Sequence, residues 1–119
     1  MSTRTTLYGL TGVGQSWQTA LYLTENHPGA PVTIISPGSE LRRQIENHLR
    51  HTHKTRAQSL SDWLEVPALN DGGVVLIMYP STAIMPAICS RLRDEPRDVI
   101  VLTCSLLVNH FILPMYIKE

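Results

Sequence analysis

Apolar residues along the chain form short runs that are separated by segments with helical spacing. Residues 32–36 have the sequence V-T-I-I-S, residues 74–79 V-V-L-I-M-Y and residues 99–103 V-I-V-L-T. Runs with so little polar alternation are typical of parallel strands that are covered on both faces. Residues 6–10 predict a shorter first strand, and the polar residues 51–58 predict a turn with a short edge strand.

The segments between these runs carry the spacing of amphipathic helices. Leu41, Ile45 and Leu49 recur at every fourth position and therefore share one helical face. Residues 82–93 predict a further helix, with a proline early enough in it to be tolerated. Strands that alternate with helices in this way indicate right-handed βαβ units.

Polar residues mark where the helices begin. Ser16 and Ser39 are placed to act as N-caps, because a hydroxyl there can accept a hydrogen bond from a free amide of the first turn. Ser59 with Asp62 approximates a capping box in front of an apolar pair. We therefore expect a single α/β domain over residues 1–119, with a three-layer, mostly parallel sheet and helices on both faces.

The last predicted strand, residues 111–117, is the exception to this alternation. Only residues 104–110 separate it from the strand before it, whereas a parallel crossover needs about a dozen residues. We expect this strand to be antiparallel, to lie at an edge, or to pair with another chain. Pro114 also fits an edge position.

Composition narrows the classes of partner. The 119 residues include ten basic and ten acidic ones, so the formal net charge is zero and direct nucleic-acid binding is not expected. Polar residues interrupt the apolar stretch 100–117, which argues against a membrane span. Cys89 and Cys104 have no metal-ligand spacing, and residues 1–6 lack the apolar stretch of a secretory signal. We expect two reduced thiols in a cytoplasmic protein.

A glycine loop between the first strand and the first helix carries a family resemblance. The loop has the spacing G-x-x-x-x-G-K-[ST], with glutamine in the lysine position; its candidate phosphate-binding residues are Gly9, Gly12, Gly14, Gln15 and Ser16. With the strand order that follows, the chain resembles P-loop NTPases of the RecA-like and signal-recognition-particle GTPase types. The resemblance implies a backbone cradle for the phosphates of ATP or GTP.

The residues that would perform phosphoryl transfer are missing from this pattern. Gln15 replaces the lysine, and Met78, Tyr79 and Pro80 stand where the family has a magnesium-associated aspartate. Because phosphoryl transfer depends on such charges, we do not expect hydrolysis. Weak ATP or GTP binding stays open, as does a simple tight turn without a ligand.

A second resemblance, to receiver domains of response regulators, begins at Pro31. The runs at residues 32–36, 56–58, 74–79 and 99–103 would be its first four strands, and Thr103 would match the switch hydroxyl. Ser36 and Pro37 replace the acidic pair, and Tyr79 or its neighbour replaces the phosphoacceptor. This pattern is similar to the pseudo-receivers of LuxR-type transcription regulators, and it leaves residues 1–30 unexplained.

Other polar groups have simpler explanations. His48, His51 and His53 are close in sequence, but no carboxylate or thiol nearby completes a metal site. Arg42 and Glu46 are spaced as an i,i+4 ion pair on a solvated helix face. No pair of carboxylates suggests general acid–base catalysis, so we predict no catalytic residues and no metal.

These observations favour a non-enzymatic regulatory or adaptor domain that acts through protein partners, as a homo-oligomer. A nucleotide-binding sensor without hydrolysis and a pseudo-receiver of a transcription regulator are the alternatives. The strand ends at residues 12–16, 36–39 and 79–81 predict a vestigial pocket. The predicted interface is the apolar C-terminal segment: Leu106, Leu107, Phe111, Ile112, Leu113, Met115 and Tyr116.

Overall fold

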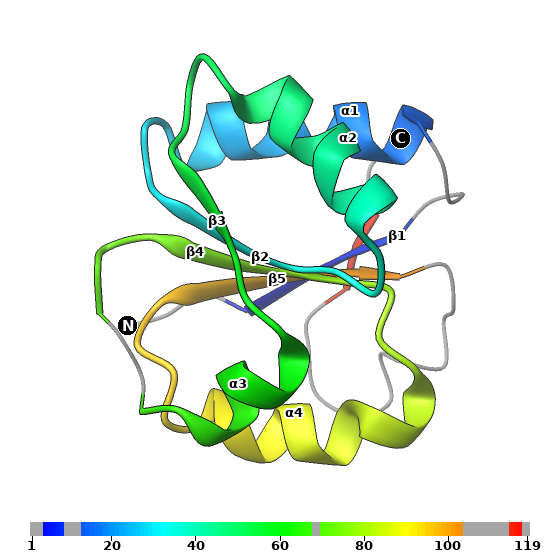
Figure 1. Cartoon of the computed structure of the whole chain (residues 1–119), viewed down its shortest axis with the longest axis vertical. Coiled ribbons are helices and arrows are strands. Elements are labelled where there is room, and N and C mark those ends of the chain that lie inside the picture. Colours follow the sequence, from blue (N-terminus) through cyan, green and yellow to red (C-terminus); the bar gives the residue numbers. More distant parts are fainter. Residues whose placement is uncertain (1–3, 9–12, 68–69, 104–114, 118–119) are drawn as a thin grey trace.

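The computed structural model describes residues 4–8, 13–67, 70–103 and 115–117 of the chain (Figure 1). The strands are β1 (Arg4–Tyr8), β2 (Val32–Ile35), β3 (Thr55–Ala57), β4 (Val74–Met78), β5 (Asp98–Thr103) and β6 (Met115–Ile117). The helices are α1 (Val13–Asn26), α2 (Ser39–Leu49), α3 (Leu60–Glu65), the short 3₁₀ turn η1 (Thr82–Ile84) and α4 (Met85–Leu92).

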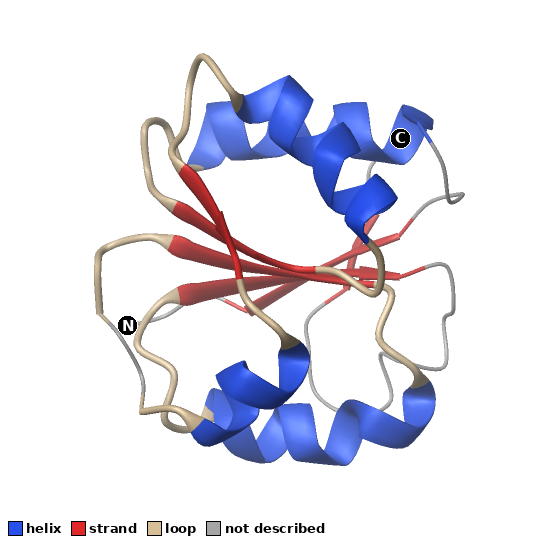
Figure 2. Ribbon diagram, in the orientation of Figure 1, coloured by secondary structure: helices blue, strands red, loops and turns tan. Residues whose placement is uncertain are grey.

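The strands form one six-stranded sheet in the order β3-β2-β4-β5-β1-β6, and every neighbouring pair is parallel. Helices α1 and α2 cover one face, and α3 and α4 cover the other (Figures 1 and 2). The predicted three-layer α/β class is therefore confirmed. None of the helices in the described ranges is long and apolar enough to cross a membrane.

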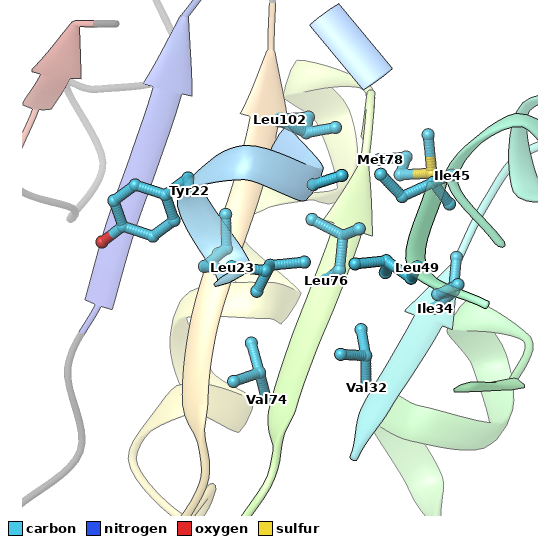
Figure 3. Close-up of a cluster of buried hydrophobic side chains, with 12 residues drawn as sticks. Tyr22, Leu23, Val32, Ile34, Ile45, Leu49, Val74, Leu76, Met78 and Leu102 are labelled. Atoms are coloured by element: carbon cyan, nitrogen blue, oxygen red, sulfur yellow. The ribbon is translucent and has the colours of Figure 1, made fainter. Parts of the chain in front are cut away.

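Alternate residues of the central strands supply two separate cores. Toward α1 and α2 point Ile34, Leu76 and Leu102, which pack with Leu23 and Leu49 (Figure 3). The other set of alternate side chains on these strands faces α3 and α4. There Ile35, Val75, Ile77, Val99 and Val101 pack with Trp63 and Ile88. Because all of β4 is buried, its continuous apolar sequence follows from its central place in the sheet.

The last strand corrects one part of the sequence prediction. β6 lies at the edge of the sheet, as one alternative had it, but it runs parallel to β1, so the antiparallel alternative is wrong. It pairs with β1, and Met115–Ile117 is the described part of the strand predicted at residues 111–117; residues 111–114 lie outside the described residues.

Two helix starts also differ from the prediction. α1 begins at Val13, so Ser16 lies within its first turn and is not the N-cap. The N-cap of α2 is Gly38, without a side-chain hydrogen bond, and Ser39 is the first helical residue. In contrast, the cap predicted for α3 is confirmed, because the Ser59 side chain accepts a hydrogen bond from the Asp62 amide at 3.1 Å.

Candidate functional site

The strand order places a crevice at the carboxyl ends of β2 and β4. If β2 is counted as the first strand, then β3 is the second, β4 the third, β5 the fourth and β1 takes the fifth place. In space the strands then lie in the order second, first, third, fourth, fifth, which is the order of flavodoxin-like doubly wound sheets. In such sheets the chain leaves the first and third strands toward opposite faces, which opens a crevice between them. Here that position lies between β2 and β4.

A pocket of about 410 Å³ occupies this position, and we call it the switch-point crevice. Residues from both strand ends line it, which places Ser36 and Pro37 beside Tyr79, Pro80 and Ser81. Of the residues predicted to form a pocket, 36–37 and 79–81 line this cavity, whereas 38 and 39 line a neighbouring hollow and 13–16 belong to α1. Its other lining residues are aliphatic, from the strands, α3 and η1: Ile35, Leu60, Ile77, Met78 and Ile84.

Ser36 shapes the β2 side of the crevice. Its hydroxyl donates to the Gly38 carbonyl at 2.7 Å and accepts from the Gly38 amide at 3.2 Å. A serine side chain that bonds the backbone two residues on holds a turn in place. This turn lies between β2 and α2, whose N-cap is Gly38, a residue without a side chain.

Tyr79 shapes the β4 side. Its φ is 52°, in the left-handed region that residues other than glycine, asparagine and aspartate rarely adopt. The Tyr79 amide donates to the Leu102 carbonyl at 2.9 Å, and its half-buried side chain packs against the core beneath α1 and α2. These contacts offset the cost of the strained backbone, which is about 1–2 kcal/mol, and they direct residues 80 and 81 into the crevice wall.

A second hollow of about 410 Å³ adjoins the crevice above the ends of β2 and β3. Ser39, Arg42, Gln58, Ser59 and Asp62 contribute its polar groups. Arg42 also forms the predicted ion pair with the carboxylate four residues on, at 3.5 Å. This hollow therefore adds hydrogen-bonding groups beside a crevice whose own described lining is uncharged.

The described part of the glycine loop, residues 13–16, opens α1, the helix that follows β1 in the chain. β1 is separated from β4 by β5, and all three run parallel. Gly14, Gln15 and Ser16 form the first turn of α1, whereas Gly9 and Gly12 lie outside the described residues. The amides of a first helical turn have no partner within the helix, so they can face an anion.

The predicted interface residues are described only at their end. Met115 and Tyr116 lie in β6, while Leu106, Leu107, Phe111, Ile112 and Leu113 lie outside the described residues. Among the described strands, β6 pairs with β1 alone and so forms one edge of the sheet.

The three histidines do not converge. His48 and His51 are exposed, whereas His53 is buried between the Thr52 hydroxyl and the His27 carbonyl, each at 2.8 Å. In the described ranges no three His, Cys, Asp or Glu side chains gather as metal ligands. His53 is therefore a structural residue that ties the end of α2 to the end of α1.

Cys89 on α4 is a free, partly buried thiol. Burial raises the pKa of this thiol above its ordinary value, and this outweighs a backbone hydrogen bond and the charge of Arg93. The reactive thiolate is correspondingly scarce at neutral pH, which fits a structural thiol. Cys104 lies outside the described residues.

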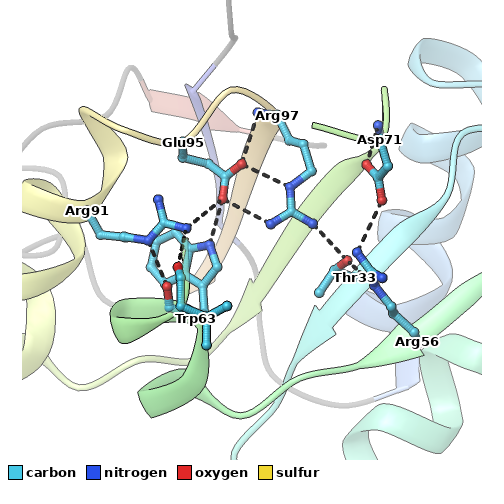
Figure 4. Close-up of polar contacts among 9 residues, drawn as sticks. Thr33, Arg56, Trp63, Asp71, Arg91, Glu95 and Arg97 are labelled. Carbon is cyan, nitrogen blue, oxygen red and sulfur yellow. Dashed lines mark hydrogen bonds and ion pairs between the residues drawn. The ribbon is translucent and has the colours of Figure 1, made fainter. Parts of the chain in front are cut away.

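A buried polar network between the sheet and α3–α4 was not expected from the sequence. The Glu95 carboxylate accepts hydrogen bonds from Trp63 Nε1 at 2.8 Å and from Arg97 Nε and Nη2 at 2.9 and 3.0 Å (Figure 4). Arg91 Nε donates to the Trp63 carbonyl at 2.7 Å. One sequence signal could have indicated this network. Arg91 follows Ile88 by three residues, so its charged side chain lies on the apolar face of α4.

The network sets the protonation state of Glu95. Burial alone would raise the pKa of this carboxyl group, but hydrogen bonds from Arg97 and Trp63 and the charge of Arg97 more than offset burial and hold the pKa below its usual value. Glu95 is therefore ionised at neutral pH, and Arg97 is held in place by it.

Comparison with known proteins adds no relative. No protein-family model, no curated protein and no solved structure matches this chain. The crevice, the helix α1 turn and the edge strand β6 are the features on which a functional proposal can be based.

Proposed function

We propose that this chain is a non-enzymatic regulatory or adaptor domain of the cytoplasm that acts through protein contacts, as a homo-oligomer. The observation that carries the proposal is the position of β6 at one edge of the sheet, with a single described neighbour. An edge strand presents a row of backbone donors and acceptors that a strand of another chain can pair with. Its sequence, M-Y-I, is apolar.

A second copy of this chain is the partner that this edge favours. Two β6 strands related by a twofold axis would pair with each other and join two sheets into one, an isologous contact. The described lining of the switch-point crevice combines aliphatic, proline and hydroxyl groups. That lining suits an apolar side chain of a further protein partner better than a phosphate.

Sedimentation velocity over a range of protein concentrations tests this proposal. We expect a concentration-dependent dimer, and we expect Tyr116→Lys to shift it toward the monomer, because charge at an edge strand opposes pairing. Thr55→Lys, the same kind of change on the opposite edge strand β3, should leave the dimer intact. A monomer at every concentration, or equal loss in both variants, would reject the proposed interface.

Nucleotide sensing is the second candidate, and the turn at Gly14–Ser16 favours it. These residues open a helix of 14 residues directly after a parallel strand, the setting in which first-turn amides bind phosphate. Calorimetric titration with ATP and GTP, with and without Mg²⁺, separates the candidates. Saturable binding that Gly14→Val abolishes would favour the sensor. Absence of binding at millimolar nucleotide would indicate that the glycine loop is a tight turn without a ligand.

The pseudo-receiver alternative draws its support from the strand order of β2 to β5. It too is a regulatory role through protein contacts. The pseudo-receiver alternative differs from the first proposal in whether residues 1–30 are needed for folding. Deletion of residues 1–30 tests this difference.

A further inference from the structure

A second cavity, of about 290 Å³, lies on the α3–α4 side of the sheet beside β3, and we call it the arginine pocket. It shares no lining residue with the switch-point crevice. Its walls come from elements far apart in the chain. Figure 4 shows Arg56, Trp63, Arg91 and Arg97, and Val66 also lines the pocket.

The two inner arginines are fixed before any ligand arrives. Arg97 is 4% exposed; it donates twice to Glu95, and its Nη1 donates to the Thr33 hydroxyl at 3.1 Å. Arg91 lies over the Trp63 ring, 5.2 Å from its centroid. Guanidinium groups that are already ordered lose little conformational entropy when they bind an anion.

Arg56 completes the cluster from β3. Its Nε donates to the same Thr33 hydroxyl at 3.2 Å and its Nη2 to Asp71 at 3.2 Å. The side chain of Arg56 is 52% exposed, so this guanidinium remains accessible to solvent and to a ligand.

The charges of the cluster do not balance. Three guanidinium groups face two carboxylates, Glu95 and Asp71, which leaves one positive charge uncompensated. Arg91 Nη1 is buried and has no hydrogen-bond partner among the described residues. Buried donors are nearly always paired, so the cluster is short of an acceptor. A ligand with negatively charged oxygens that contacts the exposed Arg56 guanidinium would supply the missing negative charge.

The rim of the pocket is apolar. Val66, which is 48% exposed, is the large hydrophobic side chain left most open in the described part of the chain, and it lines the pocket with Pro67. A ligand that combines an oxyanion with an apolar group would use the arginines and cover this rim at the same time.

We propose that the arginine pocket binds a small organic oxyanion, a carboxylate or phosphate monoester that carries an apolar substituent. The site is independent of the proposed function, since it involves neither β6, the switch-point crevice nor the first turn of α1. It gives the domain a small-molecule ligand in addition to its protein contacts.

Calorimetric titration of the full chain in low-chloride buffer tests the site, with phenyl phosphate, inorganic phosphate and benzoate as probes. We expect saturable binding of phenyl phosphate and weaker binding of inorganic phosphate, which cannot cover Val66. Binding of benzoate relative to phenyl phosphate shows which oxyanion the pocket prefers. Arg56→Gln should weaken phenyl phosphate binding about tenfold, because it removes one charge-assisted contact.

Two further variants guard against misfolding and against binding elsewhere. Val66→Asp places a negative charge at the exposed rim and should abolish binding without opening the core. Arg43→Gln, at an exposed arginine of α2 outside the pocket, and Gly14→Val, at the α1 turn, should leave the affinity unchanged. The proposal is overturned if no probe binds saturably, if Arg43→Gln weakens binding as much as Arg56→Gln, or if only Gly14→Val abolishes it.

Discussion

Glu95 connects parts of the molecule that are distant in sequence. Its buried carboxylate contacts Trp63 in α3 and Arg97 at the entrance to β5, and Arg97 in turn reaches Thr33 in β2. Burying charges is unfavourable unless they are paired and hydrogen-bonded. Here Arg97 and Trp63 satisfy both carboxylate oxygens, so the network orients α3 against the sheet.

We expect Glu95→Gln to lower the free energy of unfolding at neutral pH by about 3–5 kcal/mol, the usual loss when one member of a buried ion pair is removed. The pKa of Glu95 is lowered in the folded protein. Its stabilising contribution is therefore complete above the ordinary glutamate pKa of about 4.3 and is lost as the pH falls through the lowered folded value. Urea unfolding at a series of pH values measures this.

The wild type and Glu95→Gln should accordingly converge in stability toward acidic pH. Asp94→Asn, which changes an exposed neighbouring carboxylate, should leave the pH dependence almost unaltered. A stability difference between Glu95→Gln and wild type that stays constant as the pH falls would show that Glu95 is not held ionised by its partners.

At the scale of elements, α3 depends on its surroundings. The helix spans only Leu60–Glu65, too short to be stable alone. Three features hold it: the Ser59 cap at its start, the burial of Trp63, which is 1% exposed, and the hydrogen bonds that Trp63 makes with Glu95 and Arg91. Because α3 carries Trp63, the ring over which Arg91 lies, the arginine pocket depends on this short helix.

We expect Ser59→Ala to reduce the free energy of unfolding by about 1 kcal/mol, because the amide at residue 62 loses its acceptor. Ser90→Ala, at an exposed position within α4, should have little effect or stabilise slightly, since alanine favours helix interiors. Urea denaturation of the two variants beside the wild type provides the comparison. Equal effects of the two changes would mean that the cap does not stabilise α3.

At the scale of the whole molecule, the N-terminal segment is part of the folded body. β1 lies between β5 and β6, and α1 places Ala20, Tyr22 and Leu23 in the core. A receiver-like body that began at Pro31 would not need these contacts. In this chain β1 occupies the fifth place of the sheet, and without it β5 would become an exposed apolar edge.

Deletion of residues 1–30 should therefore abolish cooperative folding. We expect a weak far-UV circular dichroism signal and no sigmoidal urea transition in the shortened chain, whereas the full chain shows both. A shortened chain that unfolds cooperatively would favour the pseudo-receiver alternative, with residues 1–30 as an addition to a complete domain.

The candidate site was predictable in part. The apolar runs at β2 and β4 and the breaks that follow them place residues 36–39 and 79–81 at one edge of a parallel sheet, and the crevice forms there. The arginine pocket was not predicted, because its residues lie on four separate segments with no common spacing. Only the packing of α3 and α4 on the sheet brings these residues together.

By itself the sequence determined the kind and order of the elements, since apolar runs such as residues 74–78 report burial and the spacing of Ile45 and Leu49 reports a helical face. Both signals are local periodicities. Tertiary structure alone decided the sheet order, the parallel direction of β6 and the burial of Glu95 with Arg97. These features depend on contacts between distant segments, whose free energies no local pattern contains.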